Sequence, residues 1–513
     1  MRKILPAVTL IGITSFIAQV VLIRELLITF FGNELSLGII LASWLFLTAI
    51  GSLAFKKLSL KLKNLNTTLV SLLILLSLAL PAQILIARSM KNILGTIAGE
   101  IISFPAMTIY SLLTLAPACL IIGFLFALAS EIYSKGQKEK TKSITKVYIA
   151  DAIGDTTAGL LFTFFLIYFY PAYVFFALSL LCLSTAFFLC EKKKTLLLVF
   201  LVLSLATNIY ATTQLRDYSQ EQRWGNNLVS SQNSKYGNLV VTRSENQYNF
   251  YENGIFMFSS LKTVEDEELA HLALLSHPAP RDILLIGNPN LIEEILKHDV
   301  NVDYFELDPL IISTIENLAL GEVFENKKVN IHYGDARHLL KNSQKKYDII
   351  LVDLPEPGTT LLNRFYTKEF FREAKSRLNQ KGILATTLPS SETYMAKEML
   401  NINTCIFKTL KSVFSSVNIL PANIFLASDT PIDLDKMTER FDKRKIESDF
   451  ISRELISYRL YQRTELNHEQ KFAKTTTALN TDFQPISYFY DMILISTLSS
   501  SGLESILYTL YDF

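Results

Sequence analysis

Apolar residues are distributed unevenly along this chain of 513 residues. Long apolar runs dominate residues 1–212, whereas residues 213–513 mix apolar and polar positions as a globular domain does. A polar stretch at 213–235 lies between the two halves and has the composition of a linker. The pattern predicts a helical membrane domain over 1–212, followed by a linker and a separately folded part.

Seven apolar runs in the first half are about as long as a membrane-spanning helix, which needs about 20 residues. They cover roughly 5–30, 35–55, 67–87, 103–129, 147–169, 171–190 and 195–212. Lysine-rich loops at Lys56–Lys63, Lys135–Lys146 and Lys192–Lys194 alternate with loops that carry few positive charges. The positive-inside rule puts the lysine-rich loops in the cytoplasm. We expect a multi-pass protein of the cell (inner) membrane, with lipid as a partner. Seven spans place the second half outside the cytoplasm, and one span more or fewer reverses that side.

Four charged residues interrupt the predicted spans, where charge is costly. Arg24 and Glu25 lie late in the first run, and Asp151 and Asp155 are four residues apart on one face of the fifth. One interpretation is that these groups pair or reach the membrane surface. The other is a polar seam between the first and fifth helices that serves a substrate or ion, with Gly154 allowing close approach.

The second half alternates strand and helix patterns, which predicts a Rossmann-like α/β fold with a parallel sheet. Residues 236–280 begin with two or three short strands and predict a small β-hairpin unit on the substrate side, ahead of the main domain at 281–513. Strands are expected at 282–287, 302–308, 329–335, 347–353, 382–388, 416–420 and 424–428. Helices are expected at 291–298, 309–320, 367–378 and 391–414.

The stretch YDIILVDLPEPGTTLLNRFY (347–366) carries the candidate chemistry. An apolar strand ends on Asp353, and Glu356 follows between two prolines that stiffen the turn. Open α/β sheets bind ligands at the carboxyl ends of their strands. Two carboxylates there suit a cationic substrate, because one can hold an amine and accept a proton from it. The alternative is a solvated acidic turn.

Further acids end the neighbouring strands. Glu306 and Asp308 follow the Gly287 loop at the distance at which an acid accepts hydrogen bonds from ribose hydroxyls. Asp335, followed by Ala336, could contact an adenine. The loop after Gly287 reads GNPNL, with one glycine and a proline that lacks an N–H donor. The pattern predicts a nucleoside-binding domain with an unusual loop.

Composition adds few constraints. The four cysteines show no disulfide framework or C-x-x-C pair, and the six histidines show no zinc spacing, so we predict no metal. The net charge of +1 argues neither for nor against nucleic acid, and we expect no nucleic-acid partner. Whether the chain forms a homodimer stays open.

Several segments resemble the spermidine/spermine synthases, which are polyamine aminopropyltransferases with a methyltransferase-type fold. They are YGNLVVTRSENQYNFYENG, EDEELAHLALLSHP, VDYFELDP, GDAR, YDIILVDLPEPGTTLLNRFYT and LNTDFQPISYFY, with IRELL and YIADAIGDTTAGLL similar to the membrane-fused bacterial branch. The family transfers an aminopropyl group from decarboxylated S-adenosylmethionine, a co-substrate, to putrescine or a related amine.

The resemblance implies a role for each matching residue. Asp353 would be the acid/base, and Glu356, His271, Tyr366 and Asp266 would bind the amine substrate. Donor contacts would come from Glu306, Asp308, Asp335, Ala336, Gly287 and Gly237. The chain departs from the family at the GNPNL loop, at Ala270 and Leu272 around His271, at Gly237 and at Glu356.

Three functions stay open from the sequence. The first is a membrane-anchored aminopropyltransferase, which the DLPEP-to-LNRFYT block favours. The second is an N-alkyl- or methyltransferase that uses ordinary S-adenosylmethionine, since the fold is shared. The third is a polyamine or nucleoside transporter or sensor without catalysis, which the GNPNL loop and the charges within the spans favour.

Overall fold

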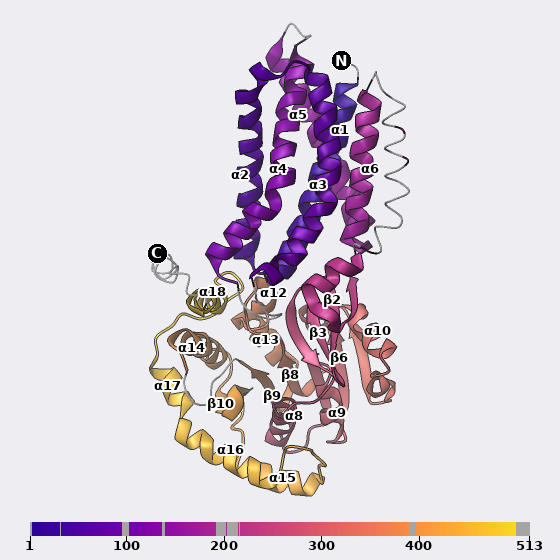
Figure 1. Cartoon of the computed structure of the whole chain (residues 1–513). Coiled ribbons are helices and arrows are strands. Elements are labelled where there is room, and N and C mark those ends of the chain that lie inside the picture. Colours follow the sequence, from indigo (N-terminus) through magenta and orange to yellow (C-terminus); the bar gives the residue numbers. More distant parts are fainter. Residues whose placement is uncertain are drawn as a thin grey trace. The chain divides into compact units, whose positions relative to one another are not determined.

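The computed structural model describes residues 3–30, 32–94, 102–135, 139–190, 216–388 and 395–498, with the isolated positions 198, 202 and 214 (Figure 1). The chain divides into two compact units. The helical unit comprises Met1–Thr242 and Glu252–Ile255, and the α/β unit comprises Arg243–Tyr251 and Phe256–Phe513.

Six long helices build the described part of the helical unit. They are α1 (Ile4–Thr29), α2 (Glu34–Leu58, extended by the short helix η1, Ser59–Lys61), α3 (Leu65–Leu94), α4 (Phe104–Ser134), α5 (Lys140–Phe164) and α6 (Pro171–Leu189). Among the described residues, five helices are long and apolar enough to cross a membrane: α1, α2 with η1, α3, α4 and α6. The helix at the fifth predicted span, α5, is not among them, and the seventh predicted span, 195–212, lies outside the described residues apart from positions 198 and 202. The prediction of seven spans is therefore supported for five, and the side of the membrane stays a prediction.

Glu25, one of the charges in the predicted spans, has partners from within the helical unit. Glu25 is 1% exposed and forms ion pairs with Arg88 (2.6 Å) and Arg223 (2.7 Å). Paired burial of this kind offsets the loss of hydration, whereas removing one partner leaves a buried charge unpaired. Glu25 is thus one of the paired charges that the first interpretation expects.

Helices α1 and α5 do pack together, as the polar seam requires. A Cβ on Gly154 would lie 2.3 Å from the Thr9 carbonyl oxygen, so glycine permits this approach. Across the same contact, a Cβ on Gly12 would lie 3.0 Å from Asp151 Oδ1 and 3.3 Å from Asp155 Oδ1. Both aspartates therefore face α1, whereas Glu25 pairs with arginines elsewhere.

Structure continues through the segment expected to be a linker. Residues 216–224 are helical, the short helix η3 (Gly225–Asn227) follows, and 228–233 form a strand. A small sheet has the strand order β1 (Leu228–Asn233), β2 (Asn238–Ser244), β3 (Gln247–Glu252) and β4 (Ile255–Ser259). Three of these strands lie within 236–262, where two or three are predicted. A separate substrate-side unit stays a prediction.

The main sheet of the α/β unit has seven strands in the order β10-β11-β9-β8-β5-β6-β7. They are β5 (Asp282–Gly287), β6 (Asn301–Glu306), β7 (Val329–Tyr333), β8 (Tyr347–Asp353), β9 (Leu378–Thr387), β10 (Ser416–Leu420) and β11 (Ile424–Ser428). Strands β7, β6, β5, β8 and β9 are parallel, and β11 pairs antiparallel with β9 and with β10. All seven lie where the apolar runs predict strands.

Helices cover both faces of this sheet. On one face Ile283 and Leu285 of β5 pack in a cluster with α8 (Val264–Ser276), α9 (Leu291–Leu296), α10 (Pro309–Asn317), α15 (Met437–Arg444) and α16 (Arg453–Leu466). On the other face Leu284 and Ile286 pack in a second cluster with α11 (Ala336–Asn342), α13 (Lys368–Ser376), α14 (Lys397–Lys411) and α17 (His468–Lys474). Alternate residues of one strand thus serve opposite layers, which explains the continuous apolar runs. The remaining helices are the one-turn α12 (Thr360–Asn363) and α18 (Ile486–Leu498).

Candidate active site

The order of the strands reverses between β5 and β8, and the carboxyl ends of these two strands define the candidate site. Gly287 and Asp353 are register partners there. Gly287 has φ +114°, and a Cβ on it would lie 1.9 Å from the Asp353 carbonyl oxygen, so only glycine fits. A parallel sheet with such a reversal opens a crevice at this point, where this class of fold binds ligands.

Asp353 closes β8 with its carboxylate in a mostly buried position. Burial raises its pKa to about 6, and the nearby Asp266 carboxylate adds to the rise, while hydrogen bonds from Asn288 and Thr387 oppose it. Thr387 Oγ1 donates to Asp353 Oδ1 at 3.1 Å. A carboxylate held in this way is a proton acceptor stronger than an ordinary aspartate and is ionised at neutral pH.

Asn288, in the GNPNL loop, connects Asp353 with Asp266. Its Nδ2 donates to Asp266 Oδ1 at 2.8 Å, and its backbone N–H donates to the Asp353 carbonyl oxygen at 3.1 Å. Asp266 also completes a capping box with Thr263 at the start of α8. The structure thus brings Asp266 and Gly287 to Asp353, and it adds Asn288 to the site.

The rest of the GNPNL loop uses its N–H groups within the protein. Asn290 N donates to Asn288 Oδ1, Leu291 N to the Asn288 carbonyl, and Ile292 N to the Pro289 carbonyl. A ligand that approaches this loop therefore meets side chains rather than a cradle of free amides.

Glu306 ends β6, next to β5. Tyr304 Oη donates to Glu306 Oε2 at 2.6 Å, and Asp308 N donates to Oε1 at 2.9 Å. Tyr304 Oη also lies 2.9 Å from the Gly287 carbonyl oxygen, which ties Glu306 to the loop. Burial raises the pKa of Glu306, opposed by these hydrogen bonds. The carboxylate oxygens still have free lone pairs, so they can accept hydrogen bonds from the two hydroxyls of a diol. The existing hydrogen bonds fix the orientation of the carboxylate.

Asp308 and Asp335 hold helices. Asp308 Oδ1 accepts from Leu310 N at 3.0 Å at the start of α10, and Asp335 Oδ1 accepts from His338 N at 2.9 Å at the start of α11. Asp335 is also bound by Arg364 in a two-contact ion pair at 2.7 and 3.0 Å. Both acids thus have helix-capping partners, and Asp335 is largely neutralised. Ala336 is the first residue of α11 and is 7% exposed.

Tyr366 fixes the turn between Asp353 and Glu356. Its hydroxyl lies 3.0 Å from the Leu354 carbonyl oxygen and 3.1 Å from that of Pro355. Burial raises the pKa of Tyr366, and the carboxylates of Asp353 and Glu356 add to the rise. The ring of Tyr366 is fully buried and lies close to both carboxylates, and its hydroxyl stabilises the turn between them.

His271 lies in a different buried network. Its Nε2 is 3.1 Å from Glu294 Oε2, and its Nδ1 is 2.9 Å from His298 Nε2, so both ring nitrogens have protein partners. Burial favours a raised pKa for Glu294, but hydrogen bonds from His271, Lys297 and Lys262 lower it to about 2. These contacts hold α8 against α9, and the expectation that His271 binds the amine gains no support from them.

Glu267 joins His271 and Glu294 in a group whose possible ligand atoms lie within 4.8 Å of one another, close enough to hold a metal ion. Glu267 already accepts hydrogen bonds from Ser448 and from the backbone of 449–451. Because each side chain has these partners, the group fits a buried structural network better than a metal centre.

Gly237 belongs to the helical unit, unlike the other expected site residues. It follows a turn in which its N–H donates to Ser234 Oγ at 3.2 Å. A Cβ on Gly237 would lie 2.5 Å from Asn253 Nδ2, so glycine makes room for that side chain. Its local role is structural, and donor contact stays a prediction.

Comparison with known proteins shows the family of this chain. A family model described as the spermine/spermidine synthase domain matches residues 262–428. The polyamine aminopropyltransferase of Prochlorococcus marinus (strain MIT 9312) is 30% identical over 253 residues, which cover 44% of this chain and 86% of that protein. The chain belongs to the polyamine aminopropyltransferase family.

Longer members of the family match over part of their length. The aminopropyltransferases of Leptospira interrogans and Oceanobacillus iheyensis are 29% and 28% identical, over 41% and 58% of this chain. The chain spans 43% and 62% of the length of these two relatives. The crystal structure of spermidine synthase from Thermotoga maritima is 21% identical, with a TM-score of 0.40 over 47% of this chain and 88% of that chain.

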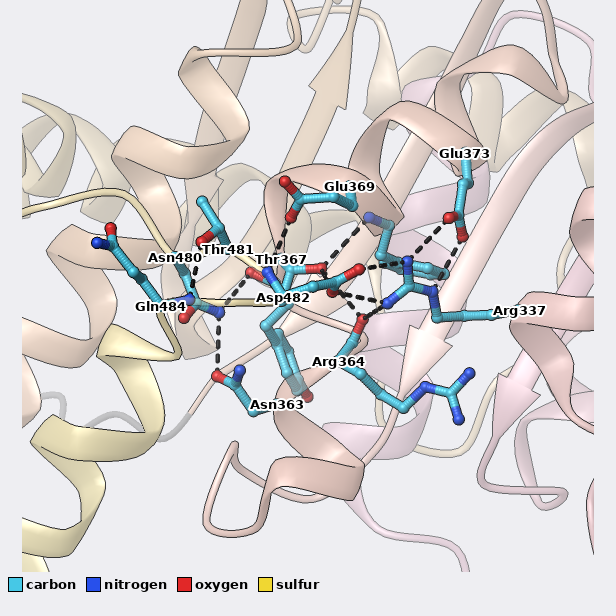
Figure 2. Close-up of polar contacts among 12 residues, drawn as sticks. Arg337, Asn363, Arg364, Thr367, Glu369, Glu373, Asn480, Thr481, Asp482 and Gln484 are labelled. Carbon is cyan, nitrogen blue, oxygen red and sulfur yellow. Dashed lines mark hydrogen bonds and ion pairs between the residues drawn. The ribbon is translucent and has the colours of Figure 1, made fainter.

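In this member of the family, the segment before α18 is bound to the block that follows Glu356. Arg337 pairs with Glu373 at 2.8 Å and with Asp482 at 2.8 Å, and Asp482 also accepts from Thr367 at 2.7 Å (Figure 2). Asn480 Nδ2 donates to Asn363 Oδ1 at 3.0 Å. We call this set the clamp: Arg337, Asn363, Thr367, Glu373, Asn480 and Asp482. The clamp fixes LNTDFQP against LLNRFYT, two segments far apart in the sequence.

Three residues that contact the expected site residues were not expected from the sequence. Tyr304 is two residues before Glu306 and so on the same face of its strand, which is a usable signal. Thr387 ends β9 beside β8, and Asn288 lies in the GNPNL loop.

Proposed function

We propose that this protein transfers the aminopropyl group of decarboxylated S-adenosylmethionine to a polyamine acceptor and releases methylthioadenosine. The amine nitrogen attacks the carbon next to the sulfonium sulfur, a nitrogen–carbon bond forms, and the carbon–sulfur bond breaks with its electron pair moving to sulfur. The positive charge thus leaves sulfur and appears on nitrogen, which then gives up a proton.

Asp353 receives that proton, and its position is the observation that carries the proposal. The carboxylate lies at the reversal point of the sheet, and burial with Asp266 raises its pKa to about 6. It is therefore ionised at neutral pH and more basic than an ordinary aspartate, as a general base for an amine should be. The sulfonium is already an activated leaving group, so the orientation of the two reactants supplies the rest of the acceleration.

Glu306 is the proposed partner of the donor's ribose. Tyr304 and the Asp308 amide hold its carboxylate, so it can accept hydrogen bonds from two hydroxyls without reorganising. Because the N–H groups of the GNPNL loop are used internally, side chains such as Asn288 and Asp266 face the donor's tail instead. Asp266 is an acid and suits the donor's ammonium group.

The same loop favours a second candidate function, which is ligand binding without transfer. A sensor or transporter would keep Glu306 and the acceptor carboxylates but would not need the donor in line with the amine. A methyl- or N-alkyltransferase that uses S-adenosylmethionine is a third alternative, since Asp353 would serve it equally well.

The five apolar helices support a membrane anchor for this activity. If α5 also crosses the membrane, the lysine-rich loops all lie on one side of it. The side of the α/β unit then depends on whether residues 191–213 cross the membrane once more. An α/β unit facing the cytoplasm has access to the donor, whereas one facing outward favours the binding role.

Incubation of the full chain in detergent with putrescine and labelled decarboxylated donor tests the proposal. We expect spermidine and methylthioadenosine in equal amounts. S-adenosylhomocysteine formed from ordinary S-adenosylmethionine would support the methyltransferase alternative. Binding of both ligands with no product would support the sensor.

A further inference from the structure

Asp491 is a buried acid for which the described part of the chain provides no partner. It lies on α18, is 1% exposed, and neither carboxylate oxygen has a hydrogen-bond partner among the described residues. Buried carboxylates are almost always hydrogen-bonded or paired with a cation, because an unpaired one loses its hydration without return. A free position of this kind indicates a ligand that brings its own donors.

The carboxylate of Asp491 is directed to the turn that carries Glu356. A Cβ on Gly358 would lie 2.9 Å from Asp491 Oδ2, so glycine at this position makes room for the acid. The turn itself is closed by Gly358 N donating to the Glu356 carbonyl oxygen at 2.7 Å. Burial raises the pKa of Asp491 well above its ordinary value, and the Glu356 carboxylate adds to the rise. The two acids therefore interact electrostatically.

The clamp gives this position a fixed place. Asn363 Oδ1 accepts hydrogen bonds from Asn480 Nδ2 at 3.0 Å and from Ser487 Oγ at 2.5 Å, so the first turn of α18 is bound to the end of α12. Apolar contacts of Tyr490 and Ile493 with α14 hold the other side of α18. These contacts on two sides of α18 hold Asp491 in place.

The cations nearest in this network are already used. Arg337 pairs with Glu373 and Asp482, and Arg364 pairs with Asp335. Among the described residues, no basic side chain pairs with Asp491, which leaves room for a cation from a ligand between Asp491 and Glu356. A primary ammonium has three donors and suits two carboxylates, whereas a hard divalent metal prefers six or more oxygen ligands.

We propose that Asp491 is an acceptor-specificity residue, which with Glu356 seats the second ammonium group of a diamine while Asp353 takes the reacting amine. This inference rests on the proposed function and adds a residue to it, Asp491, which would select a diamine over a monoamine. We call this pair of acids, Asp491 and Glu356, the seat. A monoamine leaves both acids unpaired, so the seat selects acceptors by their charge.

The test measures putrescine and butylamine with the full chain in detergent, as wild type, Asp491→Asn and Glu356→Gln. Calorimetry gives affinity, and methylthioadenosine release gives kcat and KM for each amine. We expect both variants to weaken putrescine binding about 10- to 100-fold, as for loss of one charge-assisted hydrogen bond. Putrescine should lose more affinity than butylamine in both variants, so the ratio of the two affinities is the readout. Asp435→Asn, the same change at an exposed acid, is the matched control.

Two results overturn the seat. One is wild-type putrescine affinity in both variants, and the other is an equal loss for putrescine and butylamine. Displacement of putrescine by Mg²⁺ at equal concentration would assign the position to a metal and also overturn it. If the wild type releases no methylthioadenosine but Asp491→Asn still weakens putrescine binding selectively, the seat stands and the transfer reaction fails.

Discussion

Replacing Asp353 by asparagine separates its catalytic role from its effect on stability. The substitution keeps the shape and can keep the hydrogen bond from Thr387, but asparagine cannot accept the proton. We expect turnover to fall about 10²- to 10⁴-fold, the usual contribution of a positioned general base. Affinity for methylthioadenosine should be unchanged, because the ribose contact is assigned to Glu306.

The pKa of Asp353 sets the expected change in stability. It rises from 3.8 to about 6 on folding, so the native protein holds more protons than the unfolded chain between these values. The free energy of unfolding therefore falls as pH rises through this window, by about 3 kcal/mol for a shift of roughly two units. At pH 8 Asp353→Asn should be more stable than the wild type by up to this amount, while wild-type activity should fall as pH drops below about 6.

The assay compares methylthioadenosine release with thermal unfolding of the full chain in detergent. Asp348→Asn is the matched control, since Asp348 is the second residue of the same strand and accepts hydrogen bonds from Asn379 Nδ2 at 2.8 Å, Arg281 N at 2.8 Å and Asp282 N at 3.2 Å. Burial raises the pKa of Asp348, but these hydrogen bonds, that of Asn379 first, lower it overall, so its substitution should destabilise the protein at pH 8 and spare turnover. Turnover of Asp353→Asn within about twofold of the wild type would refute the role of Asp353.

Three further predictions follow from the same contacts. Glu306→Gln should weaken methylthioadenosine binding by roughly 1.5–3 kcal/mol in calorimetry; unchanged affinity would place the nucleoside elsewhere. Arg337→Gln should lower the free energy of unfolding by about 3 kcal/mol, because it leaves Glu373 and Asp482 without their shared cation, and a shift below the error of the measurement would show that the clamp contributes little. A carboxyl-terminal alkaline phosphatase fusion should be active if the lysine-loop pattern and a span at 195–212 hold. Fluorescence of a green fluorescent protein fusion, with no phosphatase activity, would place the α/β unit in the cytoplasm.

The main sheet could be predicted from the sequence because its strands are buried on both faces. Such strands read as unbroken apolar runs, and those at 282–287 and 347–353 have the predicted bounds. The helical segments after residue 436 were not predicted, because α15 and α16 are rich in charge and pack only on one side. The linker prediction missed β1 because its sequence LVSSQN has no apolar alternation.

The positions of Asp353 and Glu306 at the ends of their strands could be predicted from the sequence, and their roles stay predictions. An acid at a strand end that precedes a helix has two interpretations, since an N-cap has the same sequence signature. Asp308 and Asp335 carry such caps in the structure, and the two roles differ only in partners that lie far apart in sequence. The pairing of Arg337 with Asp482 spans 145 residues, which no local pattern encodes.

The contact between Gly287 and Asp353 limits how this enzyme family member can be redesigned. The backbone that begins the donor loop rests on the backbone of the base, and Asn288 adds a second peptide contact to it. Grafting a glycine-rich loop from a relative must therefore leave these two positions alone and start at Pro289. A side chain at position 287 would displace the backbone of Asp353, so the start of this loop and Asp353 cannot be moved independently.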